Sequence, residues 1–149
     1  MPLNKELVGK TYPSVTYEVG REKIREFATA VGETGDLYHD ADAAKQAGYA
    51  EQPAPLTFPT ILHVRSGPSV IADPELGLNY ALVVHGEQGF EYRRPILAGD
   101  VLTATPRIAD ITAKGPHEFL TIETTMTDPD GELVVIARAT LISRGTAAG

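Results

Sequence analysis

The stretch Thr-Phe-Pro-Thr-Ile-Leu-His-Val-Arg, at residues 57–65, decides how the rest of this chain can fold. Thr57 is a good N-cap, and Pro59 falls in the first turn of the helix that would follow, where a missing N–H is tolerated. Apolar residues then lie on more than one side of that helix: Ile61, Leu62 and Val64. Because such a helix has to be buried, we predict that the helix from Phe58 to Arg65 lies at the centre of the fold.

Two helices and a loop are expected on the N-terminal side of this stretch. Four apolar residues recur at i, i+3, i+4 and i+7 and predict an amphipathic helix that ends near Gly32: Ile24, Phe27, Ala28 and Val31. Asp40 is a suitable N-cap for a short alanine-rich helix that closes at Gly48. Between these helices, residues 33–39 contain the helix breaker Gly35 and lack periodicity, so we predict a loop there.

The C-terminal half carries the pattern of β-strands, in which residues alternate between two faces. Phe90 and Tyr92 share one face of a strand, Asp128–Gly131 is a strong turn signal, and the run Leu133–Ile142 is β-rich. A further alternation predicts an edge strand near the N-terminus: Val15, Tyr17 and Val19. Helices early and antiparallel hairpins late predict an α+β fold, with an antiparallel sheet wrapped around the central helix.

The composition limits the class of protein. The 149 residues fit one domain, 1–149, which is long enough to bury a core. The net charge of −7 repels phosphate backbones and anionic lipid, so neither nucleic acid nor a membrane surface is an expected partner. The absence of cysteine excludes disulfides and thiolate metal sites. Since the N-terminus begins polar and no run of about eighteen apolar residues occurs, we expect a cytoplasmic location.

Four histidines are the natural acid–base candidates, because only histidine titrates near neutral pH without help. His39 lies in the loop among acidic residues, where two interpretations stay open: a positioned proton-transfer group, or a solvated neighbour of the following helix cap. His63 is better explained as a core histidine with a satisfied hydrogen bond, and His117 as a loop residue. His85 precedes Gly86, which lets another group approach closely, so it is a candidate for packing or for substrate binding. No two histidines have metal-ligand spacing and no glycine-rich phosphate loop occurs, so we predict neither a metal nor a cofactor.

A set of short segments, spread over nearly the whole chain, carries a family resemblance. In order, they are Arg21–Phe27, Gly32–Thr34, Tyr38–Asp40, Ala54–Phe58, His85–Gln88, Phe90, Tyr92, Arg94-Pro95 and Ala98–Asp100. Together they resemble the MaoC-like dehydratase family, in its fatty-acid-synthase-type N-terminal group, which includes the substrate-binding subunit of the mycobacterial (3R)-hydroxyacyl-ACP dehydratase. The resemblance implies a hot-dog fold, usually built as a dimer with acyl-thioester sites at or near the subunit interface.

The resemblance also assigns positions in the loop before Asp40. Catalytic members of the wider (R)-hydratase family carry Asp-x-Asn-Pro-x-His there, and aligning this chain from its Ala47–Tyr49 end places Glu33 at the Asp position and Tyr38 at the His position. His39 is one residue late. Glu33, Tyr38 and His39 are therefore the candidate catalytic residues, in an atypical form of the dyad. A tyrosine with an ordinary pKa of about 10 is a poor base at neutral pH.

The same resemblance suggests where substrate binds. Free N–H groups at the start of the central helix, at Thr57 and Phe58, suit a thioester oxyanion. Capping alone explains these two residues equally well. An apolar tunnel for the acyl chain would be lined from the helix and the facing strands, with four candidates that could equally be plain core: Phe58, Ile61, Leu62 and Phe90.

Three functions follow from this set of residues. The first is an (R)-specific enoyl-thioester hydratase or 3-hydroxyacyl-thioester dehydratase, acting on acyl-CoA or acyl-ACP in fatty-acid metabolism. The second is a non-catalytic acyl-binding subunit of a heteromeric dehydratase, motivated by the tyrosine at Tyr38. The third is a hot-dog acyl thioesterase, against which the flanking segments count. The expected assembly is a homodimer, or a heterodimer with a MaoC-like subunit.

Overall fold

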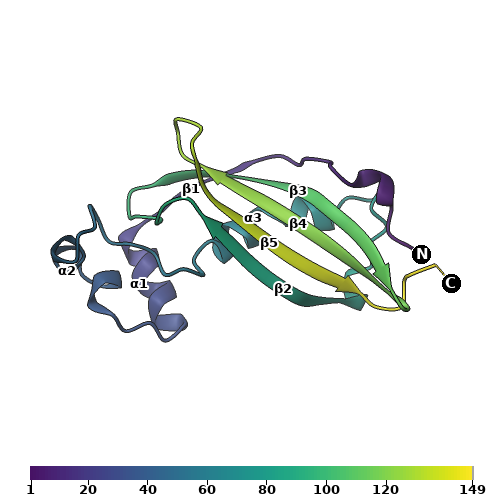
Figure 1. Cartoon of the computed structure of the whole chain (residues 1–149), viewed down its shortest axis with the longest axis horizontal. Helices are drawn as coiled ribbons and strands as arrows, with labels where there is room; N and C mark the ends of the chain where they lie inside the picture. The colour runs from purple at the N-terminus through teal and green to yellow at the C-terminus, as the bar shows by residue number, and fades with distance from the viewer. Residues whose placement is uncertain (149) are drawn as a thin grey trace.

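A five-stranded antiparallel sheet forms the body of the molecule, and the computed structural model describes it as part of residues 1–148 (Figure 1). The strands lie in the order β1-β3-β4-β5-β2. Their bounds are β1 Val15–Glu18, β2 Val83–Tyr92, β3 Val101–Lys114, β4 His117–Thr127 and β5 Leu133–Ser143. The predicted α+β class is confirmed, as are the edge position of the first strand and the turn at Asp128–Gly131.

Within residues 1–148, four helices accompany the sheet: α1 Arg21–Ala30, α2 Ala41–Gln46, α3 Thr60–Ser66 and α4 Pro68–Ile71. The same residues include three short 3-10 helices, of which only the second lies between two α-helices: η1 Lys5–Leu7, η2 Asp36–Tyr38 and η3 Tyr80–Leu82. In Figure 1, α3 lies behind the sheet, whereas α1 and α2 lie beyond one end of the strands. The loop that the resemblance singles out is therefore carried outside the sheet, between α1 and α2.

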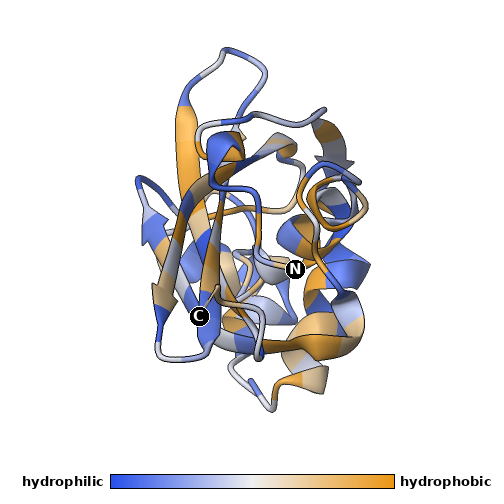
Figure 2. Ribbon diagram, turned by 90° about the vertical axis from the view of Figure 1, so that its right-hand side faces the viewer, coloured by the Kyte–Doolittle hydropathy of each residue, from blue (hydrophilic) through white to orange (hydrophobic). Residues whose placement is uncertain are grey.

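Period-two patterning accounts for the sheet, with one face toward the helices and the other toward solvent. Along β4, alternate residues from Leu120 to Met126 are buried, while the residues between them are only half-buried. Figure 2 shows hydrophilic and hydrophobic segments following one another along the strands. The outward face carries a row of charges that crosses four strands. Arg107 on β3 pairs with Glu123 on β4 at 3.0 Å, and Arg138 on β5 joins Glu123 at 2.8 Å and Glu91 on β2 at 3.1 Å.

The start of the central helix differs from the sequence prediction. The helix begins at Thr60, and no side chain caps it, so the predicted N-cap role of Thr57 is wrong. Tight turns precede it instead, in which the Phe58 N–H donates to the Pro55 carbonyl at 2.9 Å and the Ile61 N–H donates to the Phe58 carbonyl at 3.0 Å. These short turns consume backbone donors that a side-chain cap would otherwise satisfy.

The core forms around the residue just before that helix. Phe58 is fully buried, with its ring centroid 5.5 Å from that of Phe27 in an edge-on arrangement and 6.4 Å from that of Tyr17. Leu62, one turn later, is buried beside it. On the opposite side of α3, Val64 is 63% exposed. The helix is central as predicted, but one of its sides lies open in the single chain.

The two edges of the sheet differ in length. β1 has four residues, whereas β2 has ten, and within residues 1–148 it pairs on one side alone, with β5. Most of β2 up to Glu87 is exposed, and Gly86 admits the close approach predicted for it, since a Cβ there would lie 2.9 Å from Ile142 Cδ1. A long unpaired edge of this kind is a surface on which another strand can pair.

The N- and C-terminal segments lie near each other at one end of the sheet (Figure 1), and both bond to one buried carboxylate. Glu118 accepts hydrogen bonds from the Leu3 N–H at 2.9 Å and from the Thr146 hydroxyl at 2.7 Å. His117 is not a loop residue as predicted, because it is the first residue of β4 and its Nδ1 accepts from the Gly145 N–H at 3.0 Å. No helix among residues 1–148 combines the length and the apolar character needed to cross a membrane.

Candidate functional site

His39 braces the loop between α1 and α2 rather than joining a carboxylate. It directly follows η2, and its Nε2 lies 2.9 Å from the Glu33 backbone carbonyl, to which it can donate a hydrogen bond. Within residues 1–148, no carboxylate forms an ion pair with His39. The next residue, Asp40, caps α2 as predicted, accepting from the Asp42 N–H at 2.9 Å.

Glu33 is exposed, and its carboxylate turns toward its own loop. Oε1 lies 3.5 Å from the Gly35 N–H, at the limit of a hydrogen bond. Gly35 in turn leaves room for the Tyr38 ring, since a Cβ there would meet two ring carbons at 3.4 Å. The three candidate catalytic residues are thus close in space, but the side chains of Glu33 and His39 are not hydrogen-bonded to each other.

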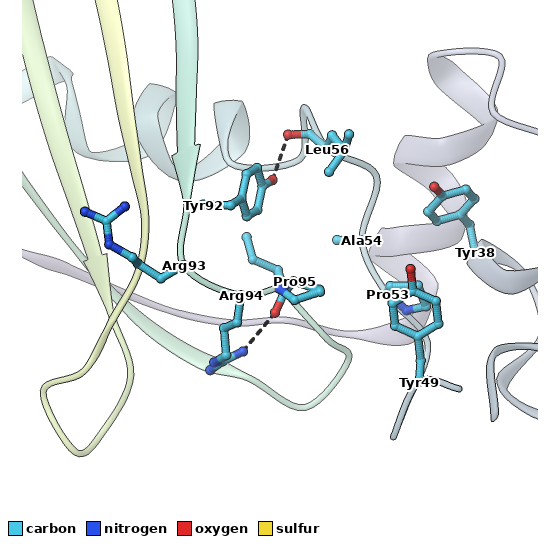
Figure 3. A pocket seen from close by; sticks show the side chains of 10 residues that line it. Tyr38, Tyr49, Pro53, Ala54, Leu56, Tyr92, Arg93, Arg94 and Pro95 are labelled. Carbon is cyan, nitrogen blue, oxygen red and sulfur yellow. Dashed lines mark hydrogen bonds between the residues drawn. The ribbon is translucent and has the colours of Figure 1, made fainter. Parts of the chain in front are cut away.

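Tyr38 faces a hollow of about 330 Å³, which we name the tyrosine pocket (Figure 3). Its walls include Tyr38, Tyr49, Ala54, Leu56, Tyr92 and Arg94. The Tyr38 carbonyl accepts a hydrogen bond from Nε2 of the buried Gln52, which ties the loop to the segment before α3. Burial first, and then the charge of Glu33, raise the pKa of Tyr38 above its ordinary value. Its phenol therefore stays protonated at neutral pH and can donate, but not accept, a proton.

Two other polar groups of the tyrosine pocket, on Tyr92 and Arg94, are already engaged in the fold. The Tyr92 hydroxyl donates to the Leu56 carbonyl at 2.7 Å, and burial raises the pKa of Tyr92. Arg94 makes two hydrogen bonds to Asp100, at 2.8 and 3.1 Å. In Figure 3 the side chain of Arg93 points away from the pocket, and it pairs with Glu91 at 3.0 Å. The pocket offers shape and proton donors rather than a base.

Five of the six residues predicted to bind substrate fall into three groups, and the sixth, His85, lies elsewhere. Phe58 and Leu62 are fully buried in the core, so in this conformation neither borders an open space. Ile61 and Phe90 are partly buried against the same core cluster. Thr57 is exposed in the turn before α3. The Phe58 N–H is not free for an oxyanion, because it is bonded to the Pro55 carbonyl.

A second and larger hollow, of about 510 Å³, lies between α3, α4 and the far end of β2, and we name it the histidine cavity. Its walls include His63, Val64, Ile71, Tyr80, His85 and Leu141. Val64 and Tyr80 are among the most exposed large apolar side chains of the chain, at 63% and 68%. The cavity thus has an apolar wall with two imidazoles in it, one from the central helix and one from the edge strand.

His63 combines a core hydrogen bond with a place on this wall. Its Nδ1 lies 2.9 Å from the Thr124 hydroxyl on β4, which confirms the predicted satisfied core histidine. Burial, with a smaller contribution from His85, lowers the pKa of His63 to about 4. The ring is therefore neutral at physiological pH. His85 is exposed on β2, with Nε2 3.2 Å from the Gln88 side-chain oxygen.

Sequence reasoning missed several lining residues. Tyr92 was placed on the same face as Phe90, and that shared face was the signal that could have brought it into the pocket. Tyr49 and Leu56 carried no such signal, because they meet Tyr92 only through the tertiary fold. Among the residues that the structure describes, no three of His, Cys, Asp and Glu gather in a way that could hold a metal ion.

Comparison with known proteins identifies the family. The sequence profile described as "FAS1-like, dehydratase domain region" matches residues 6–137. A UPF0336 protein of Saccharopolyspora erythraea is 46% identical over 148 residues, covering 99% of this chain and 95% of that protein. Over most of its length, therefore, the chain belongs to the family of FAS1-like dehydratase regions.

Solved structures agree with this assignment. The C-terminally truncated HadBC (3R-hydroxyacyl-ACP dehydratase) complex from Mycobacterium tuberculosis contains a chain with a TM-score of 0.79 and 33% identity, covering 89% of this chain and 92% of that one. The unliganded R-hydratase PhaJ1 from Pseudomonas aeruginosa, at 19% identity, matches in fold with a TM-score of 0.70 over 94% of this chain and 83% of its own. The predicted hot-dog fold and the resemblance to MaoC-like dehydratases are both confirmed.

Proposed function

We propose that this member of the FAS1-like dehydratase family is the acyl-binding subunit of a heteromeric 3-hydroxyacyl-thioester dehydratase. The observation that carries the proposal is the loop between α1 and α2. There Tyr38, a protonated phenol, lines the tyrosine pocket, and His39, the histidine of this loop, is hydrogen-bonded to the Glu33 backbone carbonyl. A partner subunit would supply the acid–base pair.

The chemistry sets what the missing groups have to do. Elimination of water from a 3-hydroxyacyl thioester needs a base for the α-proton, an acid for the departing hydroxyl and donors for the enolate-like oxygen. Tyr38, with a raised pKa, suits the donor roles and not the base. Loss of a well-placed base lowers the rate on the order of a hundred- to ten-thousand-fold. A chain with this loop is therefore expected to bind substrate but to turn it over poorly by itself.

The unpaired edge supports a partner subunit. The exposed part of β2 presents backbone groups to another strand, and beside it the open side of α3 exposes Val64. Val64 and Tyr80, which share the wall of the histidine cavity, are 63% and 68% exposed, and apolar exposure that is contiguous in this way is typical of surfaces that another chain covers. The solved relative at 33% identity is itself part of a two-component dehydratase complex. We assign the β2 edge and the open side of α3 to that interface.

The acyl chain is assigned to the histidine cavity, since the predicted lining residues Phe58 and Leu62 are packed core. The cavity has the size of common small-molecule sites, which run from about 300 to 1,000 Å³. Val64, Ile71 and Leu141 give it an apolar wall, as an alkyl chain requires. The thioester end would lie at the tyrosine pocket, on the other end of β2, within reach of Tyr38.

A second candidate, a hydratase that works without a catalytic partner, rests on one observation. The Nδ1 of His39 makes no hydrogen bond within residues 1–148, so that nitrogen is available to accept a proton. In this reading His39 is the base and Tyr38 the donor, with Glu33 close by. In this arrangement the His39 ring is held only by the hydrogen bond between its Nε2 and a backbone carbonyl. No carboxylate among residues 1–148 pairs with the ring to stabilise an imidazolium.

Reconstitution separates the two candidates. The chain is purified alone and together with a MaoC-like subunit that carries the full Asp/His pair, and hydration of enoyl-CoA is followed by loss of the conjugated enoyl absorbance. We expect the mixture to exceed the chain alone by on the order of a hundredfold or more. His39→Ala should leave the mixture's rate unchanged within about twofold.

Other results would overturn the proposal. If the chain alone reaches the rate of the mixture and loses it in His39→Ala, the self-sufficient hydratase is correct. If the chain releases free thiol from saturated acyl-CoA, it is a thioesterase. Tyr38→Phe is the variant matched to His39→Ala, because it removes the hydroxyl of the other candidate side chain and keeps the ring in the pocket.

A further inference from the structure

The histidine cavity contains a polar group that an unsubstituted alkyl chain would leave unsatisfied. Only 8% of the surface of His63 is exposed, and the cavity wall that it lines is otherwise made largely of aliphatic side chains. Its Nδ1 is bonded to Thr124, and its Nε2 has no hydrogen-bond partner among the described residues. A ligand that covered this nitrogen with methylene groups would strip it of solvent and offer nothing in return.

The protonation state of His63 narrows the partner that its Nε2 can take. Burial keeps the ring neutral at physiological pH, so it neither attracts a carboxylate nor repels a cation by charge. A neutral imidazole nitrogen either donates or accepts one hydrogen bond, depending on its tautomer. A neutral oxygen, in a hydroxyl or a ketone, matches both the hydrogen bond and the apolar surroundings.

The position of the cavity fixes where along the ligand this oxygen would lie. His85, on the cavity wall, and Tyr92, in the tyrosine pocket, are seven residues apart on β2, or roughly 23 Å at about 3.3 Å per residue. With the thioester at the tyrosine pocket, only the distal part of a long chain reaches His63. His85 faces the same cavity from β2 and can offer a second imidazole.

We infer that His63 is a specificity-determining residue, which selects long acyl thioesters that carry a hydroxyl or keto oxygen far from the thioester over plain alkyl chains of the same length. The inference rests on the proposed acyl-binding function and goes one step further, to the chemical class of the chain. It needs no covalent step at His63, only a hydrogen bond from or to Nε2.

Binding to the full-length chain tests this inference. The probes are stearoyl-phosphopantetheine and a series of its oxo and hydroxy isomers, in which the oxygen moves one carbon at a time toward the methyl end. Calorimetric titration should show one isomer bound about fivefold more tightly than the plain chain, the gain expected of one satisfied hydrogen bond. In the same titration followed by NMR of ¹⁵N-labelled histidine, the His63 Nε2 signal should move with that isomer and not with the plain chain.

Two variants separate recognition from folding. His63→Leu alone would leave the Thr124 hydroxyl buried without a partner, so we combine it with Thr124→Val, which removes both partners of the hydrogen bond. The double variant should bind all isomers and the plain chain alike. Ile71→Ala, which trims the apolar wall, should weaken every probe and keep the fivefold preference.

The outcomes distinguish this inference from the proposed function. If the plain chain binds and supports turnover with the partner but no isomer is preferred, or if the double variant keeps the preference, the specificity role of His63 is overturned and the acyl-binding function stands. If no probe binds and the partner's turnover does not depend on this chain, the proposed function falls as well.

Discussion

The tyrosine pocket and the histidine cavity lie at opposite ends of β2, and they differ in the polar groups that they offer to a ligand. In the tyrosine pocket the hydroxyl of Tyr92 and the guanidinium of Arg94 are bonded within the chain, and burial of Tyr38 keeps its phenol protonated. In the histidine cavity, one ring nitrogen of a buried histidine is left without a partner. Tyr92 and Arg94 thus hold the shape of the pocket and leave the Tyr38 phenol as a proton donor, whereas the cavity offers a neutral imidazole nitrogen for a hydrogen bond with a ligand.

This difference bears on where binding and proton transfer would take place in the proposed complex. In the register that the resemblance predicts, the loop beside the tyrosine pocket corresponds to that of a catalytic dyad, and here the side chains of His39 and Glu33 are directed to the loop's own backbone. The cavity at the other end has volume and an apolar wall, and its two imidazoles lie far along β2 from the thioester position proposed at the tyrosine pocket. Binding and catalysis are therefore expected on different subunits.

The largest effect that would test this comparison comes from Phe58, which lies in the chain between Leu56 of the pocket and His63 of the cavity. If Phe58 is core, as its full burial indicates, Phe58→Ala lowers the free energy of unfolding by about 3–5 kcal/mol. Urea denaturation followed by circular dichroism measures this loss. If Phe58 instead lines a ligand tunnel, the variant keeps its stability and changes acyl affinity.

Val64→Ala is the matched control for that experiment, because Val64 is on the open side of the same helix. It should change the unfolding free energy by no more than about 0.5 kcal/mol. A loss as large as that of Phe58→Ala would mean that α3 is covered on both sides, for example in a stable dimer.

Much of the fold followed from the sequence because its signals are local. Period two from β2 to β5, the turn at Asp128–Gly131 and the cap at Asp40 each involve neighbouring residues, and each was found where predicted. The apolar character of residues 57–65 identified the central helix for the same reason. The prediction that Thr57 caps the helix was wrong, because capping depends on where the first turn begins. Here the residues after Pro55 form tight turns closed by backbone hydrogen bonds.

The site was less accessible, because its contacts join distant segments. Helical periodicity predicts that Phe58 and Leu62 face inward, but it does not distinguish a packed core from the wall of a cavity. His63 reaches Thr124 across 61 positions of sequence, and the tyrosine pocket assembles from residues before α3 and at the end of β2. The roles of Glu33, Tyr38 and His39 in turnover remain predictions that the reconstitution experiment addresses.

A pH titration of stability sharpens the comparison from the cavity side. The pKa of His63 is lowered from 6.5 to about 4 in the folded chain. Between these values the unfolded chain binds a proton that the folded chain does not, so stability falls as pH falls from about 6.5 to 4. The difference between the two pKa values corresponds to a loss of about 3 kcal/mol in the free energy of unfolding. This loss is absent above pH 6.5 and reaches its full size below pH 4.

Urea unfolding at several pH values between 7 and 4 measures this slope. Since exposed carboxylates also titrate near the lower limit, the quantity to compare is the difference between the wild type and the His63→Leu/Thr124→Val variant. The variant should lose the part of the slope that His63 supplies, whereas Val64→Ala should keep it. An unchanged slope in the double variant would mean that His63 is not buried as neutral imidazole.

The smallest expected effect concerns the loop beside the tyrosine pocket, and it compares two residues that the sequence predicted to be caps. Asp40 accepts from the Asp42 N–H at 2.9 Å, so Asp40→Ala should cost about 1 kcal/mol of unfolding free energy. Thr57 is exposed and caps nothing, so Thr57→Ala should stay within about 0.5 kcal/mol. Thermal unfolding of the two variants side by side measures the difference. Equal losses would mean that Thr57 contributes to the start of α3 after all, and the loop around Tyr38 would then be no more firmly held than the turn before the central helix.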